Sequence, residues 1–417
     1  MTPLRLGFIP LSDCAVLAVA LEKGFFRRHG LDVVLSREVS WANIRDKTAV
    51  GALDGAQMLA GMPLAAAAGI DPVASPLLTA FSLDLNGNAI TVSNELWQRM
   101  QAAGAVTASS NGAALRRVID DNRRSGRPLL RFAMVYPFST HNYELRYWLA
   151  AGGIDPDADV QLTVVPPPRM VEALERGLID GFCVGEPWNS LAVLRELGRV
   201  AATKYEIWNN SPEKVLALSR GFAERDEELH QALLRALIEA AVWTDAAENR
   251  AEVARILAVP RYLNAPEELL AGSLTGRVVF GSSAAAVDMP DFHVFQRYAA
   301  NYPWISHAVW LLAQMVRWGQ LASPVDLLAT AKAAYRPDLY REAARAVGIA
   351  APEVDLKPEG IHRAPWHLGG AGGAIEMGSD MFCDGRVFDA TDVVGYLAGF
   401  GAGAPQMDLD ALAALNS

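Results

Sequence analysis

The sequence predicts an α/β protein that is divided into two lobes. The chain has 417 residues, too many for one ordinary hydrophobic core. Short apolar runs alternate with segments of helical period from the first residues onward, an order that indicates parallel strands joined by helices. This alternation breaks off near residues 83–90 and begins anew at residues 131–135. We therefore expect the chain to cross between the lobes in the first of these stretches.

The elements expected in the first lobe follow from local signals. Ser40 is a good N-cap residue for a helix that begins at Trp41, and Gly30 can end the preceding helix. Strands are expected at residues 4–10, 31–35 and 54–59, and helices at residues 14–26, at residues 41–47 and from residue 61 onward. Because ligands of such sheets bind at the carboxyl ends of the strands, we expect functional residues in the loops that follow them.

The second lobe repeats the pattern. Ser139 or Thr140 can cap a helix that runs through Leu149. Strands are expected at residues 131–135, 160–165 and 181–184, a helix at residues 170–176, a return to the first lobe at residues 214–218, and helices at residues 226–242 and 246–257. We therefore assign residues 1–85 with 190–300 to lobe 1, residues 86–189 to lobe 2, and residues 301–417 to a C-terminal extension packed on lobe 1.

Composition argues against several classes of function. The formal net charge of −10 argues against an extended nucleic-acid surface, and three scattered cysteines are too few for a disulfide framework or a zinc site. No run of 18 apolar residues is present in the sequence, so no membrane span is expected. The first residues lack the pattern of a secretory signal, and Asp13 fits a lipoprotein cleavage box poorly, so we expect a cytoplasmic protein.

Residues 137–214 contain the best candidates for a functional site. His141 and Lys214 lie near strand ends or helix starts, among glycine and proline turns and with few carboxylates nearby in the sequence. Such a set of hydrogen-bond donors suits the capture of a small anion better than acid–base chemistry. Ordinary loop residues of an α/β protein are the alternative for each position taken alone.

Two features near the C-terminus carry no comparable signal. His362 and His367 flank a proline–tryptophan pair and Cys383 follows, but this spacing matches no metal-ligand pattern, so loop residues are expected. The glycine-rich run at residues 369–373 precedes no P-loop lysine, so it is not expected to hold phosphate. We expect neither a metal nor a cofactor.

Several motifs resemble one known family along nearly the whole chain. EKGFF at residues 22–26 and GLDV at 30–33 are similar to the opening of the type II solute-binding proteins of oxyanion and sulfonate ABC transporters. The longer runs are SWANIRDK at 40–47, MLAGMPL at 58–64, NGNAIT at 86–91, RYWLAAGGI at 146–154, PPP at 166–168 and VGEPWN at 184–189. These runs resemble the nitrate- and bicarbonate-binding proteins NrtA and CmpA. The resemblance implies a two-lobed type II periplasmic-binding-protein-like fold with mostly parallel sheets and hinge crossovers.

The resemblance also implies roles for single residues. Trp41 matches a pocket tryptophan whose indole N–H can donate to an oxygen, and His141 matches a pocket histidine near a helix N-terminus. Asn88 falls where the transporter proteins tend to carry a glutamine, so its amide reaches less far. Lys214 matches the lysine that pairs with nitrate, where bicarbonate-binding relatives place an acidic residue that holds calcium. The floor of the site is implied to consist of Pro167, Val184 and Gly185.

By this resemblance we expect a cytoplasmic nitrate or nitrite sensor rather than an enzyme. Among the members without an export signal, the chain resembles the NasS family, whose members hold back an RNA-binding antiterminator, NasT, until the anion arrives. The implied partners are nitrate or nitrite and a NasT-like protein, without direct contact to nucleic acid or membrane. Two alternatives stay open. One is the binding component of an ABC transporter, and the other is a thiamine-pyrimidine biosynthesis enzyme, which shares the fold and the Gly-Phe-Phe opening.

Overall fold

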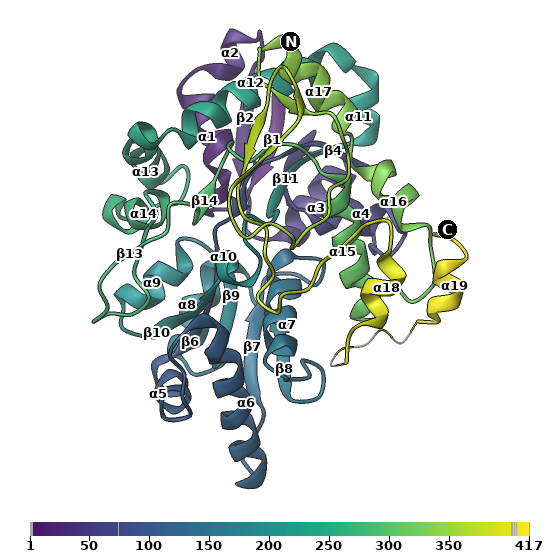
Figure 1. Cartoon of the computed structure of the whole chain (residues 1–417). Coiled ribbons are helices and arrows are strands. Elements are labelled where there is room, and N and C mark those ends of the chain that lie inside the picture. The colour runs from purple at the N-terminus through teal and green to yellow at the C-terminus, as the bar shows by residue number, and fades with distance from the viewer. Residues whose placement is uncertain (1–2, 74, 402, 404, 406, 417) are drawn as a thin grey trace.

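Two five-stranded sheets, one in each lobe, form the framework of the molecule (Figure 1). The structure is a computed structural model that describes residues 3–73, 75–401, 403, 405 and 407–416. Lobe 1 contains, in sheet order, β2 (Val33–Arg37), β1 (Leu4–Phe8), β3 (Gly55–Leu59), β11 (Lys214–Ser219) and β4 (Leu77–Ser82). Lobe 2 contains β10 (Gly198–Thr203), β6 (Asn88–Ser93), β9 (Gly181–Gly185), β7 (Leu130–Met134) and β8 (Val160–Val164).

One strand in each sheet runs against the other four. In lobe 1 this strand is β11, which pairs antiparallel with β3 and β4, while β1 pairs parallel with β2 and β3. In lobe 2 it is β6, which pairs antiparallel with β9 and β10, while β7 pairs parallel with β8 and β9. The expected two-lobed α/β fold with mostly parallel strands is therefore confirmed.

Two groups of helices pack on the lobe 1 sheet through separate apolar clusters. Side chains alternate along β11, so that Leu216 and Leu218 join one cluster and Val215 and Ala217 join the other. The first cluster includes α1 (Ala15–Glu22), α2 (Phe25–Arg28), α12 (Glu227–Asp245), α13 (Arg250–Ala258) and α17 (Pro337–Ala346). The second includes α3 (Trp41–Ala49), α4 (Gly61–Ala67), α15 (Ile305–Arg317) and α16 (Leu327–Ala334). As predicted, Ser40 caps α3, its hydroxyl accepting from the backbone N–H of Asn43 at 3.2 Å.

Lobe 2 extends further along the chain than the sequence indicated. Its helices are α5 (Asn94–Ala102), α6 (Ala108–Arg124), α7 (Thr140–Ala151), α8 (Met170–Glu175) and α9 (Trp188–Leu194). The predicted boundary after residue 189 is wrong, because β10 pairs with β6 from Gly198↔Ser93 to Thr203↔Ala89. A short apolar strand such as β10 does not indicate its partner, so its local sequence fitted either sheet.

The remaining elements are short and lie in the hinge, on lobe 1 and in the extension. The helices are α10 (Lys204–Ile207), α11 (Arg220–Arg225), α14 (Glu267–Leu274), α18 (Val393–Ala398) and α19 (Leu409–Ala413). The strands are β5 (Leu85–Asn86), β12 (Arg277–Val278), β13 (Val287–Asp288), β14 (His293–Val294), β15 (Ala351–Pro352), β16 (Trp366–Leu368), β17 (Gly370–Ala371) and β18 (Ile375–Met377). None of the helices in the described ranges combines the length and the apolar character that crossing a bilayer would require.

The two crossovers between the lobes run side by side. The backbone N–H of Leu83 donates to the carbonyl of Lys214 at 2.8 Å, and that of Asn86 donates to Ser211 at 3.0 Å. The lobes also meet directly beyond the carboxyl end of β1, where the backbone N–H of Ser12 donates to the carbonyl of Glu186 at 2.8 Å. The expected crossover near residues 83–90 is thus present, and the lobes are in contact beyond the hinge.

The C-terminal extension touches both lobes rather than lobe 1 alone. Its helices α15 and α16 pack on α4, and α17 packs on α12, as expected for contact with lobe 1. The extension also reaches α7 of lobe 2, where the hydroxyl of Tyr147 donates to Asp384 Oδ1 at 2.9 Å and that of Tyr143 to Gln320 Oε1 at 2.7 Å. The extension therefore bridges the lobes on the side where α15 and α7 meet (Figure 1).

Replacing Phe382 with alanine should destabilise the protein through this bridge. Its ring is buried and stacks on Trp208, with ring centroids 4.6 Å apart, and lies 5.6 Å from Tyr147. Loss of a buried aromatic ring costs about 3–5 kcal/mol, which urea denaturation followed by fluorescence should measure as a lower free energy of unfolding. Val387→Ala is the control, because that side chain is 48% exposed and should cost less than about 0.5 kcal/mol. Equal losses in the two variants would contradict the bridge.

Candidate functional site

Six of the seven predicted site residues come together where the lobes meet. Lobe 1 supplies Trp41, the first residue of α3, and Lys214, the first residue of β11. Lobe 2 supplies His141 from the first turn of α7 and Asn88 from the start of β6, with Val184 and Gly185 at the end of β9. All six are buried. The prediction that strand ends and helix starts carry the site is consistent with this placement.

Lys214 is held by two carboxylates. Its Nζ lies 2.8 Å from Asp13 Oδ2 and also donates to Glu213 Oε1. The ammonium lies 5.6 Å from the centroid of the Trp41 ring, a cation–π distance. Burial works against the charge of Lys214, but the carboxylates of Asp13, Glu213 and Asp84 outweigh it and hold its pKa above the ordinary value. The lysine is therefore a permanent cation inside the protein.

A second lysine completes the network around Glu213. Lys204 Nζ lies 2.7 Å from Glu213 Oε2, 2.6 Å from Glu144 Oε1 and 2.6 Å from the carbonyl of Pro212, so its three donors are satisfied. Glu213 also accepts from the hydroxyl of Thr140 in α7. Burial alone would raise the pKa of Glu213, but Lys204, Lys214 and His141 lower it well below its ordinary value. Glu213 is thus a fixed anion between two cations.

The fold brings more carboxyl groups to the site than the sequence around His141 and Lys214 indicated. Asp13, Asp84, Glu144 and Glu213 are all buried in this network, with Asp84 accepting from the backbone N–H of Lys214 at 3.1 Å. They arrive from the ends of different strands and from α7, and only Glu213 neighbours Lys214 in the sequence. The available signal was an acidic residue just after a predicted strand, as at Asp13, whereas the strand before Asp84 was not predicted.

Several polar atoms at this place are buried without a hydrogen-bond partner among the described residues. They are Trp41 Nε1, Asn88 Oδ1, both ring nitrogens of His141, Ser12 Oγ and Asp84 Oδ2. Such atoms are costly unless something satisfies them. His141 Nε2 does lie 3.5 Å from Glu213 Oε1, but the two atoms do not form a hydrogen bond. The arrangement therefore suits a small polar guest.

His141 is neutral in this setting. Burial, opposed by Glu213 and reinforced by the two lysines, lowers its pKa to about 3. A neutral imidazole has one donor and one acceptor nitrogen, so His141 can offer a directed N–H without adding a charge. The fixed positive charge of the site accordingly comes from Lys214.

Close backbone approach explains the glycine at position 185. Asn88 and Gly185 are paired in the lobe 2 sheet, and a Cβ on Gly185 would lie 3.2 Å from Asn88 Oδ1 and 3.5 Å from Asp13 Oδ2. The Asn88 amide itself donates to Glu144 Oε2 at 3.2 Å, and the carbonyl of Val184 accepts from Asn189 at 2.7 Å. Gly185 thus lets the two lobes close over the site.

Pro167 is the seventh predicted site residue. It begins a short 3-10 helix after β8 and is buried, but none of the described contacts joins it to Lys214, His141 or Trp41. No group of three or more His, Cys, Asp or Glu side chains in the described ranges is arranged to hold a metal ion. Between Asp13 and Glu213, the position of a cation is taken by the ammonium of Lys214.

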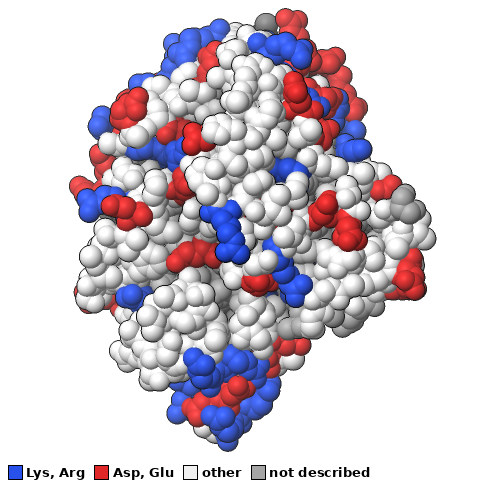
Figure 2. Space-filling view, viewed as in Figure 1, with Lys and Arg blue, Asp and Glu red and all other residues white. Residues whose placement is uncertain are grey.

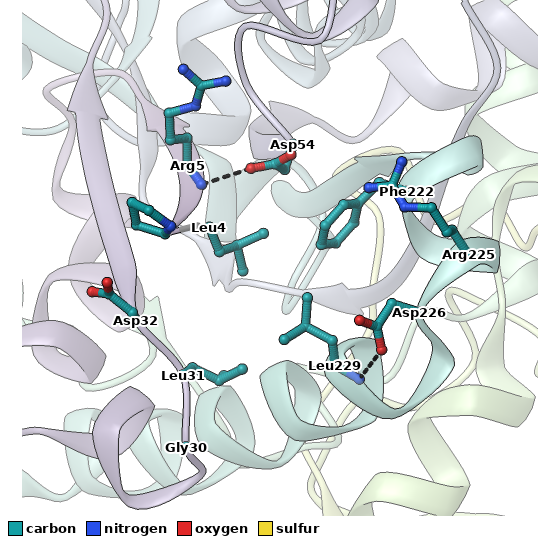
Figure 3. Close-up of a pocket in the computed structure, with 11 residues that line it drawn as sticks. Leu4, Arg5, Gly30, Leu31, Asp32, Asp54, Phe222, Arg225, Asp226 and Leu229 are labelled. Atoms are coloured by element: carbon teal, nitrogen blue, oxygen red, sulfur yellow. Dashed lines mark hydrogen bonds between the residues drawn. The ribbon is translucent and has the colours of Figure 1, made fainter. Parts of the chain in front are cut away.

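A separate cavity of about 430 Å³ lies on lobe 1 (Figure 3). It is lined by residues that precede or begin β1, β2 and β3, at the opposite end of these strands from Lys214, and by residues of α11 and the start of α12. Its carboxylates serve the backbone, because Asp54 accepts from the N–H of Arg5 at 2.8 Å and Asp226 from that of Leu229 at 3.0 Å. Its described lining includes no buried polar atom that lacks a partner, so we place the candidate site between the lobes.

The fold and the buried site together define the class: a two-lobed solute-binding protein. Residues 1–258 match the model of the NMT1-like family. The chain is 35% identical over 403 residues to the nitrate/nitrite binding protein NrtA of Synechococcus elongatus, an alignment that covers 94% of this chain and 85% of that protein. The chain therefore belongs to the NMT1-like family and is of the NrtA and CmpA type.

Further similarities agree with this membership. The bicarbonate-binding protein CmpA of Synechococcus elongatus is 31% identical, over 94% of this chain and 85% of that protein. The nitrate import ATP-binding protein NrtC of Synechocystis is 41% identical over 95% of this chain, which spans only 55% of that protein's length. The crystal structure of the periplasmic nitrate-binding protein NrtA from Synechocystis superimposes with a TM-score of 0.85 and 30% identity, covering 96% of this chain and 99% of that one.

The expectation that the chain is not an enzyme is confirmed by these relatives. Those of them that the chain covers to 85% or more are named as binding proteins. The thiamine-pyrimidine alternative is therefore set aside, and the site is a binding site.

Acid should destabilise the protein through His141. Between its ordinary pKa of 6.5 and the folded value of about 3, the unfolded chain binds a proton that the folded chain does not. The free energy of unfolding therefore falls as the pH drops through this window. In His141→Gln, the loss of stability between pH 7 and pH 5, measured by urea denaturation, should be about 2 kcal/mol smaller than in the wild type. His367→Gln, at an exposed position, should behave like the wild type; an unchanged response in His141→Gln would contradict the buried neutral imidazole.

Proposed function

We propose that the protein binds nitrate or nitrite between its lobes. The observation that carries this proposal is the convergence of unpartnered buried N–H groups, from Trp41 and His141, on a network that contains the cation Lys214. An ammonium group has three donors, and the described structure pairs two of them with Asp13 and Glu213. One donor remains for a guest that carries acceptors.

Nitrate and nitrite have the chemistry that this site calls for. Each is small, carries one spread charge and offers only acceptor oxygens. A lysine supplies a point charge, and the indole and imidazole N–H groups supply direction. Hydrogen bonds to a charged partner are roughly twice as strong as neutral ones, and closure of the lobes over the guest keeps water out. A lysine at position 214, where bicarbonate-binding relatives are expected to carry an acidic residue, favours nitrate or nitrite and binding without calcium.

For the role of this binding, we favour a cytoplasmic sensor that controls an RNA-binding antiterminator of NasT type. The support is the resemblance of the sequence to the NasS family and a net charge of −10, which would suit a basic partner. Figure 2 shows charges of both signs scattered over a largely uncharged face, with basic side chains gathered among a few acidic ones at the lower end, around α6. A basic partner would dock away from that end. The binding component of an ABC transporter is the second candidate, favoured by the close structural similarity to a periplasmic nitrate-binding protein.

Titration calorimetry should detect binding of nitrate and nitrite in the micromolar range without calcium. Trp41→Phe should weaken it roughly tenfold to a hundredfold, because a hydrogen bond to a charged group contributes about 1.5–3 kcal/mol. This variant is sharper than Lys214→Ala, which should abolish or greatly weaken binding but also leaves Asp13 and Glu213 without their cation. Trp148→Phe is the matched control. The indole N–H of Trp148 is likewise buried without a described partner, but Trp148 lies two turns beyond His141 along α7. Calcium-dependent bicarbonate binding, or equal affinities in the two variants, would contradict the assignment.

A test of the sensor role is co-purification with a NasT-type antiterminator. If the partner prefers the open lobes, the complex should form without nitrate and dissociate in millimolar nitrate, because the anion and the partner then weaken each other by the same factor. Trp41→Phe should need more nitrate to release the partner, and Trp148→Phe should behave like the wild type. A complex that never forms, or that survives nitrate in all three proteins, would favour the transporter role instead.

A further inference from the structure

Carboxyl groups outnumber ammonium groups around the proposed anion site. In the described network, the carboxyl groups of Asp13, Asp84, Glu144 and Glu213 are buried together with only two ammonium groups, those of Lys204 and Lys214. His141 adds no charge, because burial keeps it neutral at ordinary pH. A monovalent anion that enters this place adds one more negative charge to an excess of carboxyl groups. Something positive must therefore accompany the anion.

Asp13 is the carboxyl group that an entering anion would displace. Its Oδ2 lies 2.8 Å from Lys214 Nζ, and the same oxygen lies 3.5 Å from where a Cβ on Gly185 would be, at the floor supplied by lobe 2. Its Oδ1 accepts from Gln57 Nε2, and Gln57 Oε1 in turn accepts from the N–H of Ile9 at 2.9 Å. Asp13 thus stands between the lysine and the opposite lobe, on a short chain of hydrogen bonds.

The other three carboxyl groups have partners besides the Lys214 ammonium. Glu213 is shared among Lys204, Lys214, Thr140 and His141, so its loss would leave a second lysine without a counter-ion. Glu144 holds Lys204 and the Asn88 amide. Asp84 accepts from the backbone N–H of Lys214 rather than from its ammonium. Of these four carboxyl groups, only Asp13 forms an ion pair with Lys214 and with no other described cation.

We propose that Asp13 takes up a proton when the anion binds, so that the anion replaces the Asp13 carboxylate as counter-ion of Lys214. This inference rests on the proposed function and assigns to Asp13 a positioning role in the site. The proton comes from solvent, so that one anion and one proton enter together and the charge of the buried network is unchanged.

The groups that face Asp13 favour a higher pKa of this carboxyl group when the anion is bound. Lys214 and Glu213 face it from the start of β11, Asp84 from the loop after β4, the Gln57 amide from β3, and the Cys14 thiol from its own turn. Burial already raises the pKa of Asp13, and Lys214 is the main group that lowers it. An anion on Lys214 compensates that lysine and brings a further negative charge, so both changes raise the pKa of Asp13 again.

Calorimetry can count the proton. Nitrate is titrated into the wild type at one pH in buffers of different ionisation enthalpy, and the dependence of the observed heat on the buffer gives the protons taken up per nitrate. Nitrate is the probe because it is not itself protonated near neutral pH. We expect uptake approaching one proton in the wild type, and a dissociation constant that rises by up to about tenfold per pH unit.

Asp13→Asn tests whether Asp13 is the group that takes up the proton, because asparagine has the shape of a protonated aspartate but does not titrate. We expect proton uptake near zero in this variant and an affinity that hardly changes with pH. Asp159→Asn is the matched control, since Asp159 is also a buried aspartate but pairs with Arg116 and Arg123 far from Lys214. It should take up protons like the wild type.

Three outcomes would overturn the inference. Nitrate binding by the wild type without proton uptake would do so on its own, even if Asp13→Asn failed to fold. Uptake that persists unchanged in Asp13→Asn would place the proton on another group, such as His141. No nitrate binding at any pH would overturn the proposed function, and this inference with it, and is distinguished from the first outcome because no heat of binding would be seen in any buffer.

Discussion

The buried carboxylate of Glu213 is the group on which both lobes depend. It binds Lys204 at 2.7 Å and Lys214 next to it in the chain, accepts from Thr140, and lies 3.5 Å from His141. An unpaired charge in a protein interior is strongly destabilising, so a single buried anion fixes the positions of all the groups that compensate it. The return strand of lobe 1, the hinge helix α10 and the first turn of α7 are therefore held in one arrangement.

The polar atoms beside this network differ from it, because they are buried without a hydrogen-bond partner among the described residues. Trp41 Nε1 and the ring nitrogens of His141 are as deeply buried as Glu213, yet the described chain offers them no partner. A folded protein tolerates such atoms where a guest completes them. The lobe 1 cavity makes the contrast clear, because its polar groups are exposed or occupied by the backbone. Burial combined with incomplete hydrogen bonding, rather than the size of a cavity, distinguishes the site.

Local signals in the sequence were enough for much of the fold. The Ser40 cap, the first strand and the alternation of strands and helices each depend on residues close together in the chain, and the structure has them where they were predicted. Long-range pairings were not accessible in this way. The sequence of β10 is compatible with either sheet, and only its pairing with β6 shows that it belongs to lobe 2.

The same distinction applies to the site. Single positions such as Trp41, His141 and Lys214 could be named from motifs, and the structure brings them together. The carboxylates that compensate Lys214 could not, because Asp13 lies 201 residues away in the chain and reaches the lysine only through the order of the strands in the sheet. Contact of the extension with α7 was missed for the same reason, since Tyr147 and Asp384 are 237 residues apart.

Helix α7 connects the buried site to the outside of the molecule. His141 stands in its first turn, and Tyr147, six residues further and about 9 Å along the axis, is bonded to Asp384 in an exposed loop of the extension. A shift of α7 as a whole would displace Tyr147 together with His141, and with it the contact to Asp384 at the surface. A macromolecule that binds residues 383–385 could distinguish the occupied site from the empty one without contacting the site itself. The extension thereby connects a buried site to the exposed surface.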